Sequence, residues 1–320
     1  MTRPVDIGHV RYGGQMEIKN IAIIGAGMMG KMIAYIFASK YKVTVYDITP
    51  QDIIGGIRES TKELIDKEII TSEELENRLS KIRFTEKMDD PDIANADLLM
   101  EAVFEDMELK RRIFGELENI CRADCIFCTN TSVISPSEMS VNLKHRERFV
   151  ATHFWNPPHL IPLVEVVMSD ATNPDIAQLV FDILEDVGKK PVLCKVDVPG
   201  FVANRLQHAL WREAIYMVEK GIADPKTIDD ACKYGPGLRW PILGPMENSD
   251  MVGIELTYNI HDYILKHLAD NHEPSPMLKE MLDRGDLGMK SGKGWQEWTP
   301  EQVSSVSSGL REYLIKLQKK

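Results

Sequence analysis

The chain has 320 residues, of which 43% are hydrophobic and 27% charged, and its formal net charge at pH 7 is −11. This composition is typical of a globular protein, and the length suggests about two domains. A negative surface repels the phosphate backbone of nucleic acids, so we expect a small-molecule ligand and no nucleic-acid partner. Five cysteines are an odd number in a long chain, which excludes a disulfide scaffold.

Residues 1–18 have no apolar segment of the kind found in signal peptides, and we expect an irregular lead-in there. The most apolar window, 21–38, contains Lys31 and three glycines, so we expect no membrane span. Cys125 and Cys128 form a C-x-x-C within a predicted strand, where an offset of three places the two thiols on opposite faces. We therefore expect buried, reduced cysteines in a cytoplasmic protein rather than a metal or redox pair.

Short apolar runs alternate with amphipathic segments as far as residue 196. The runs predict strands at 20–25, 42–47, 96–103, 125–131, 149–154, 163–168 and 190–196. The amphipathic segments predict helices at 28–39, 107–120 and 174–187 and a long helical region at 51–80. Such alternation predicts a mostly parallel, doubly wound α/β sheet in a domain of residues 19–196.

The sequence changes character at Pro199–Gly200, which interrupts the chain. After this point apolar residues recur at helical spacing, and Gly221 and Gly235 mark two helix ends. The predicted helices span 200–221, 224–235, 244–268, 276–283 and 300–318. Residues 197–320 are therefore predicted to form a second, all-α domain.

A glycine-rich turn follows the first predicted strand. In "IAIIGAGMMG", Gly25, Gly27 and Gly30 have G-x-G-x-x-G spacing, and Met28 and Met29 complete the turn as a helix begins. This is the context of a dinucleotide-binding turn, in which the helix N-terminus faces a pyrophosphate.

Asp47 ends the second predicted strand, twenty-two residues after Gly25. A carboxylate at this place accepts hydrogen bonds from ribose hydroxyls and repels a 2′-phosphate. The turn and Asp47 together predict a Rossmann-like domain that binds NAD rather than NADP. A Rossmann domain that binds FAD, or that has no cofactor, is the alternative.

The segment "HFWNPPHLIPLVEVV" (153–167) contains the best candidates for acid–base chemistry. Oxidation of an alcohol by hydride removal also needs a base, and histidine is suited to that role near neutral pH. His153 follows an apolar strand at its carboxyl end, where doubly wound sheets form their sites. Glu165 interrupts an apolar strand, where a lone carboxylate is costly to bury. If residues 153–163 turn back, Glu165 can orient His153; the alternative is a strand-edge glutamate facing water.

Six sequence blocks occur in order after Lys19: "GAGMMG", "EAVFEDMELK", "TNTS", "HFWNPP" with "LVEVV", "DVPGFVANRL" and "GMKSGKGW". In this order and spacing the chain resembles the 3-hydroxyacyl-CoA dehydrogenase family. The resemblance implies a Rossmann-like NAD domain followed by an all-α dimerisation domain, and hence a homodimer. It also implies NAD-linked interconversion of an L-3-hydroxyacyl-CoA, such as 3-hydroxybutyryl-CoA, and the 3-ketoacyl-CoA, as in fatty acid metabolism.

The resemblance also implies roles for individual residues. The catalytic pair of the family falls on His153 and Glu165. The resemblance implies that Asn156 orients the substrate oxygen and that Ser132 hydrogen-bonds the hydroxyl or keto oxygen. It also implies that the helical domain contributes Asn204 to the active site. Near the cofactor the family positions are Glu105, Lys110, Ser132 and, more loosely, Lys290.

Contacts to CoA fall on Ser60 and Lys67. Their helix is rich in charges of both signs, and such a helix is usually a solvated face.

The same segment departs from family members that act on CoA esters. Pro157–Pro158 and Ile161–Pro162 are more similar to branches that oxidise free hydroxy acids or alcohols, such as gulonate, carnitine and pyridine-alcohol dehydrogenases. The leading hypothesis is therefore a dehydrogenase of a 3-hydroxyacyl-CoA, and the alternative is a dehydrogenase of a free 3-hydroxy acid or related alcohol. A non-catalytic NAD-binding structural protein is a third hypothesis, which the intact His153 and Glu165 pair disfavours.

Overall fold

The computed structural model of the chain describes residues 17–318, and the expected lead-in lies almost wholly outside this range. Two compact units make up the described chain. The first contains the residues up to Val202 together with the end of the chain from Glu312, and the second runs from Ala203 to Arg311.

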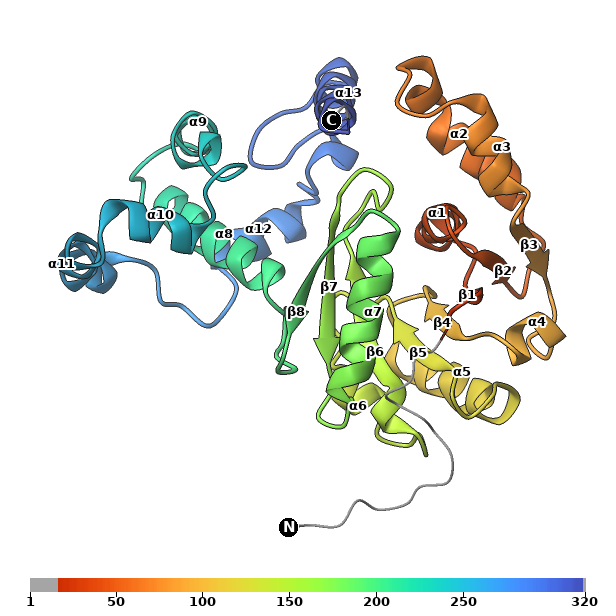
Figure 1. The fold of residues 1–320 in the computed structure, drawn as a ribbon. Coiled ribbons are helices and arrows are strands. Elements are labelled where there is room, and N and C mark those ends of the chain that lie inside the picture. The colour runs from red at the N-terminus through yellow and green to blue at the C-terminus, as the bar shows by residue number, and fades with distance from the viewer. Residues whose placement is uncertain (1–16, 319–320) are drawn as a thin grey trace, which may run out of the picture. The chain divides into compact units, whose positions relative to one another are not determined.

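An eight-stranded sheet forms the centre of the first unit, in the order β3-β2-β1-β4-β5-β6-β7-β8 (Figure 1). Every neighbouring pair is parallel except β6 and β7, which are antiparallel. The predicted doubly wound, mostly parallel sheet is thus confirmed. The strands are β1 (Asn20–Ile24), β2 (Lys42–Tyr46), β3 (Ile82–Thr85), β4 (Leu98–Glu101), β5 (Ile126–Thr129), β6 (Phe149–Phe154), β7 (Leu163–Met168) and β8 (Lys190–Cys194).

Helices cover both faces of the sheet. Ile21 and Ile23 of β1 join one apolar core, and Ala22 and Ile24 join the other, because successive side chains of a strand point to opposite faces. The first core also contains residues of α1 (Met28–Phe37), α2 (Ile53–Asp66), α3 (Ser72–Leu79) and α7 (Pro174–Asp186). The second contains residues of α4 (Pro91–Ala94), α5 (Met107–Ile120) and α6 (Pro136–Met139).

The long helical region predicted over 51–80 consists of two helices, α2 and α3. The chain leaves α2 through Glu68, whose φ is 57°, and Thr71 begins α3 with a capping box to Glu74. The strand β3, which follows directly, was not predicted. It is a four-residue edge strand with an exposed Arg83, so it has little of the apolar signal of a central strand.

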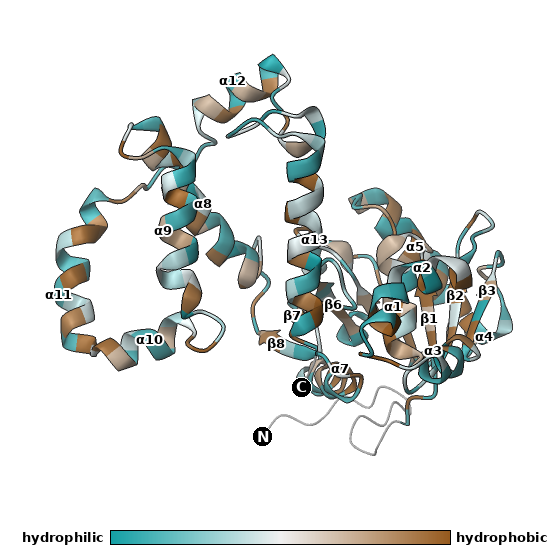
Figure 2. Ribbon diagram, turned by 90° about the horizontal axis from the view of Figure 1, so that it is seen from above, coloured by the Kyte–Doolittle hydropathy of each residue, from teal (hydrophilic) through white to brown (hydrophobic). Residues whose placement is uncertain are grey.

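The second unit is helical, as predicted. Its helices are α8 (Ala203–Glu219), α9 (Pro225–Tyr234), α10 (Pro245–Val252), α11 (Ile254–Ile264), α12 (Pro276–Arg284) and the greater part of α13 (Pro300–Lys316). The helix expected over 244–268 is broken at Gly253, whose φ of +100° cannot continue a right-handed helix. Figure 2 shows polar and apolar residues alternating along α8, α10 and α11.

Candidate active site

The strand order reverses between β1 and β4, and ligands of doubly wound sheets bind at the carboxyl ends of the strands beside such a point. The glycine-rich turn lies there. Gly25 has a φ of +103°, and a Cβ on it would come within 2.7 Å of the Ala102 carbonyl oxygen. A Cβ on Gly30 would come within 1.9 Å of the Gly25 carbonyl oxygen. These two positions therefore require glycine.

The surface beside this turn fits a dinucleotide pyrophosphate. A Cβ added at Gly27 would meet no atom of the described residues within 4 Å, so the backbone is open to close approach. Gly27 and Met28 are exposed where α1 begins, and Met29 is half-buried. The first amide groups of a helix are free to donate to an anion, so the N-terminus of α1 can hold the two phosphates.

Asp47 follows β2 and is fixed by the glycine-rich turn itself. Its Oδ2 accepts a hydrogen bond of 2.8 Å from the Ala26 amide, and its Oδ1 accepts one of 3.2 Å from the Thr49 amide. The carboxylate is half-exposed, so it remains accessible to a ligand. Its place beside the turn suits the ribose hydroxyls of NAD.

Lys110 lies in a buried network with a carboxylate that the sequence analysis missed. Both Lys110 and Glu101 are fully buried, and Lys110 Nζ donates to the two Glu101 oxygens at 2.8 and 2.9 Å. Glu101 also accepts from the Val103 amide and the Thr129 hydroxyl. Burial raises the pKa of Glu101, against the charge of Lys110. Glu101 interrupts the apolar run "ADLLMEAV", which is the same signal that identified Glu165.

Glu105 forms the exposed side of this network. Its Oε1 accepts hydrogen bonds from the Thr131 hydroxyl at 2.6 Å and the Ser132 amide at 2.7 Å, and its Oε2 lies 3.3 Å from Lys110 Nζ. Burial opposes ionisation of Glu105, but these hydrogen bonds and the charge of Lys110 outweigh it, so its pKa lies below the ordinary value. Glu105 thereby fixes the backbone that carries Ser132.

His153 and Glu165 are directly paired residues of the antiparallel strands β6 and β7. The His153 Nδ1 lies 2.8 Å from the Glu165 Oε2, and the exposed fractions are 6% for His153 and 0% for Glu165. The predicted reversal of the chain between the two residues is therefore present. A carboxylate can only accept, so Nδ1 carries the proton and Nε2 carries the lone pair.

Two further donors hold the Glu165 carboxylate. The Trp155 indole Nε1 donates to Oε2 at 3.3 Å, and the Val202 amide donates to Oε1 at 2.9 Å. The His153 ring also packs against Phe201, with ring centroids 5.9 Å apart. A carboxylate held in this way next to an imidazole can balance the charge of a positive imidazolium.

The segment between the two strands is held by Lys189. This lysine is buried, and its Nζ donates to the Pro158 carbonyl and, at 3.1 Å, to the Ile161 carbonyl. Burial lowers the pKa of Lys189 to about 8. The sequence did not single out Lys189, because a lysine beside another lysine, Lys190, suggests an exposed turn.

Two more predicted site residues lie near His153 in the chain or in the sheet. Ser132 is exposed just after β5, and Asn156 is exposed three residues after His153. Asn130, which also follows β5, accepts a hydrogen bond of 3.0 Å from the Phe154 amide and so joins the end of β5 to that of β6. The roles of Ser132 and Asn156 toward a substrate stay predictions.

The residues predicted to contact CoA have partners within the protein. The Ser60 hydroxyl donates to the Gly56 carbonyl one turn earlier in α2, at 2.9 Å. Lys67 Nζ lies 3.7 Å from the Glu312 Oε1 in α13. Asn204 and Lys290 belong to the second unit, and their predicted contributions to the site stay predictions.

The cysteines of the first unit do not gather into a site. Cys128 packs in one core of the sheet and Cys125 in the other, which confirms the opposite faces predicted for this pair.

Across residues 17–318, no group of three or more His, Cys, Asp or Glu side chains could hold a metal ion. Over the same range, no helix combines the length and apolar character needed to cross a bilayer.

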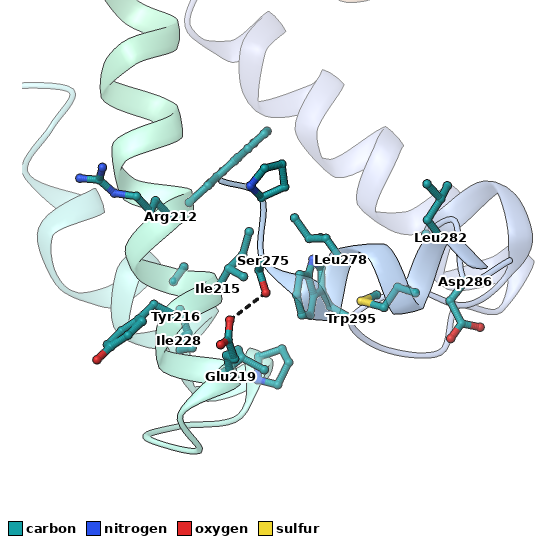
Figure 3. A pocket seen from close by; sticks show the side chains of 18 of the residues that line it. Arg212, Ile215, Tyr216, Glu219, Ile228, Ser275, Leu278, Leu282, Asp286 and Trp295 are labelled. Carbon is teal, nitrogen blue, oxygen red and sulfur yellow. Dashed lines mark hydrogen bonds between the residues drawn. The ribbon is translucent and has the colours of Figure 1, made fainter. Parts of the chain in front are cut away.

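A separate cavity of about 1040 Å³ lies within the second unit. It is lined by α8, α9, α12 and the segment 286–298, including Trp211, Trp295 and Trp298. Figure 3 shows Glu219 of α8 bonded to Ser275, a hydrogen bond of 2.8 Å, beside Leu278 and Trp295. The sequence analysis did not anticipate this cavity, because its lining comes from segments far apart in the chain.

A dinucleotide turn and a buried His–Glu pair at the carboxyl edge of one sheet are the features of a dinucleotide-dependent oxidoreductase. Residues 20–198 match the NAD binding domain of 3-hydroxyacyl-CoA dehydrogenase, and residues 200–298 match the C-terminal domain of the same enzyme. The chain belongs to the 3-hydroxyacyl-CoA dehydrogenase family, and it is an NAD-dependent dehydrogenase.

Proteins of this family that are similar to the chain are named for different substrates. The chain is 31% identical over 308 residues to 5-formyl-3-hydroxy-2-methylpyridine 4-carboxylate 5-dehydrogenase of Mesorhizobium japonicum, covering 94% of this chain and 98% of the relative. It is 33% identical over 288 residues to a probable 3-hydroxybutyryl-CoA dehydrogenase of Bacillus subtilis, covering 88% and 98%. A crystal structure of the pyridine-carboxylate type of dehydrogenase, described as an NAD+ dependent dismutase, matches with a TM-score of 0.85 and 31% identity, covering 95% of this chain and 98% of that one.

Proposed function

We propose that the protein catalyses the reversible, NAD-linked oxidation of a CH–OH group, with His153 as general base and Glu165 as the carboxylate that orients it. The observation that carries this proposal is the buried hydrogen bond of 2.8 Å between His153 Nδ1 and Glu165 Oε2. A structural protein needs no such pair, because burying a carboxylate costs free energy.

The residues of the chain act in a defined order. The bond to Glu165 keeps the proton on Nδ1, so Nε2 of His153 takes the proton of the substrate hydroxyl. Glu165 then stabilises the imidazolium, while Asn156 and Ser132 hold the substrate oxygen. The chemistry supplied by a bound NAD would be acceptance of the hydride. The residues of the first unit that would hold the cofactor are Gly25, Gly27, Met28, Met29, Gly30 and Asp47, and those that would support its site are Glu105, Lys110 and Ser132.

NADH formation by the purified protein tests this proposal. The substrate panel is 3-hydroxybutyryl-CoA, free L-3-hydroxybutyrate and L-carnitine. We expect His153→Ala to lower kcat by orders of magnitude with whichever substrate is oxidised, while NAD still binds. His145→Ala is the matched control, because His145 is a half-exposed histidine paired with Glu147. Equal loss in both variants, or undiminished NADH formation by His153→Ala, would refute the role of His153.

The substrate was expected to be an L-3-hydroxyacyl-CoA, with a free 3-hydroxy acid or related alcohol as the alternative. Both share the chemistry of His153 and Glu165. One observation favours the alternative: Lys67, the cation expected to contact CoA, lies 3.7 Å from Glu312 of the same chain. The pyridine-carboxylate relative also has a substrate name without CoA.

We propose in addition that the protein is a homodimer that associates through its helical unit. Within the described range 203–264, none of the helices α8 to α11 has a buried residue. Apolar helical residues need a surface to pack against, and a second copy supplies it. Leu256, Ile260 and Tyr263 share one face of α11 and are 52%, 47% and 71% exposed. Ile260→Lys is expected to shift the protein toward monomer in light-scattering measurements, and an unchanged mass would contradict this interface.

The buried cysteines Cys121, Cys125, Cys128 and Cys194 form no disulfides, which agrees with a reducing compartment such as the cytoplasm.

A further inference from the structure

The last residues of α13 return to the first unit. The match to the family ends at residue 298, so α13 lies beyond it. The segment Glu312–Gln318 nevertheless belongs to the same compact unit as the NAD-binding sheet. We call these residues, 312–318, the C-terminal strap.

The strap contacts both α2 and the segment that joins the catalytic strands. Ile315 is 2% exposed and packs in one apolar cluster with Leu64 of α2 and Leu160, which are 4% and 3% exposed. The Gln318 side chain donates a hydrogen bond of 2.8 Å to the Leu160 carbonyl. Leu160 lies between His153 and Glu165 in the chain, so the strap is attached directly to the segment that joins the strands of the proposed base and its carboxylate.

The strap also neutralises a cation. Three basic residues lie on α2 or directly after it, and each has a carboxylate partner: Arg58 pairs with Glu76, Lys62 with Asp66, and Lys67 with Glu312 of the strap. A CoA ester carries a 3′-phosphate and a pyrophosphate, and recognition of such groups depends on cations that are available to them. A small free acid presents a single carboxylate and needs no such row of cations.

We propose that the C-terminal strap is a specificity determinant, and that it selects a small free hydroxy acid over a CoA ester. Ile315 and Gln318 occupy the space between α2 and residue 160, and Glu312 places a negative charge beside Lys67. This inference rests on the proposed dehydrogenase function and specifies its substrate class.

The test measures the ratio of kcat/KM for 3-hydroxybutyryl-CoA to that for free L-3-hydroxybutyrate, with the full-length protein and saturating NAD. We expect a ratio below about 0.1 for the unaltered chain, equivalent to more than about 1.4 kcal/mol of discrimination. The double variant Glu312→Lys/Ile315→Ser is expected to raise the ratio at least about tenfold, because it frees Lys67, adds a cation and opens the apolar contact. Leu310→Ser is the matched control: Leu310 lies on the same helix but is 58% exposed, so the ratio should not change.

The conservative variant Glu312→Gln protects the test against misfolding. It keeps the size of the side chain and the packing of Ile315, and removes the negative charge that faces both Lys67 and Lys316. Binding of CoA itself, measured by calorimetry, should become detectable or tighten at least about threefold in this variant. This readout does not need turnover.

The outcomes separate the two proposals. Absence of NADH with every substrate of the panel would contradict the dehydrogenase function. NADH formation with a ratio above one in the unaltered chain would leave that function intact and overturn the strap proposal. The strap proposal would also fail if the double variant gave the same ratio as Leu310→Ser, or if Glu312→Gln bound CoA no better than the unaltered chain.

Discussion

Replacement of Glu165 by glutamine tests the catalytic pair most directly, because it changes one atom in a buried site. Both oxygens of the carboxylate accept hydrogen bonds: Oε2 from His153 and Trp155, and Oε1 from the Val202 amide. A carboxylate is acceptor-only, whereas an amide has one accepting oxygen and one donating nitrogen. Glutamine therefore places a donor against a donor in either orientation.

The two orientations predict different losses. If the amide nitrogen faces Val202, the backbone bond is lost and a neutral group remains to balance the imidazolium. If it faces His153, the imidazole must accept at Nδ1, its proton moves to Nε2, and the base is lost. Loss of the base in the second orientation is expected to lower kcat by a factor of about 10³–10⁴, which equals a loss of about 4–5.5 kcal/mol of transition-state stabilisation. Either orientation also costs about 1–3 kcal/mol of folding stability, because a buried donor is left unsatisfied.

The assay compares kcat for NADH formation with the dissociation constant of NAD. We expect kcat to fall by at least about 10³ in Glu165→Gln while NAD affinity stays within about threefold, since His153, Trp155 and Val202 lie outside the glycine-rich turn. Trp155→Phe is the control. It removes one donor to Glu165 and keeps the bond to His153, so it should lose less than about tenfold, as expected for one neutral hydrogen bond. A folded Glu165→Gln protein with nearly full kcat would refute the proposed pair.

Three further predictions concern the cofactor side and the buried charges. Lys110→Met should lower the free energy of unfolding by about 3–5 kcal/mol, because Glu101 stays buried without its cation. Burial then favours the protonated Glu101, so the stability of the variant in urea should increase as the pH falls. A loss of stability that does not depend on pH would contradict this prediction. Burial lowers the pKa of Lys189 to about 8, so between pH 8 and pH 10.5 the unfolded chain binds more protons than the folded protein. The free energy of unfolding should therefore rise with pH across that window by about 3 kcal/mol. Lys189→Met should abolish this rise, as measured by urea titrations at several pH values. Asp47→Ala should weaken NAD binding and reduce the preference for NAD over NADP, measured as the ratio of their kcat/KM values; an unchanged ratio would show that Asp47 does not recognise the ribose.

The sequence could predict the pairing of His153 with Glu165 because one physical rule applies to Glu165. A carboxylate inside an apolar strand must have a partner. His153 was the candidate partner because it follows the preceding apolar strand in the sequence. Glu101 obeys the same rule within "ADLLMEAV", and its partner Lys110 lies nine residues later on α5. The pairing was missed because Lys110 lies in the charged run "ELKRR", where a lysine suggests a solvated face.

Other features depend on tertiary contacts that no local pattern records. The edge strand β3 has four residues and two partly buried apolar side chains, so its pairing with β2 defines it more than its sequence does. The return of α13 to the first unit depends on Ile315 meeting Leu64 and Leu160, which are more than 150 residues apart from it in the chain. Amphipathic periodicity identified the helix but could not identify the surface on which it packs.

The two buried carboxylates divide the proposed site between them. Glu101, through Lys110, positions Glu105, and Glu105 fixes the backbone of Ser132 beyond β5. Glu165 fixes His153 at the end of β6.

These two networks meet at Asn130, which accepts a hydrogen bond from the Phe154 amide next to His153. A substrate oxygen must lie between the base and the hydroxyl that positions it, so the separation of His153 and Ser132 has to be constant. Hydrogen bonds to buried groups provide that constancy better than exposed loops do, because each broken bond would leave a buried polar group unpaired. The cost of burying charge at β4 and β7 is therefore explained by the geometry that the proposed proton transfer requires.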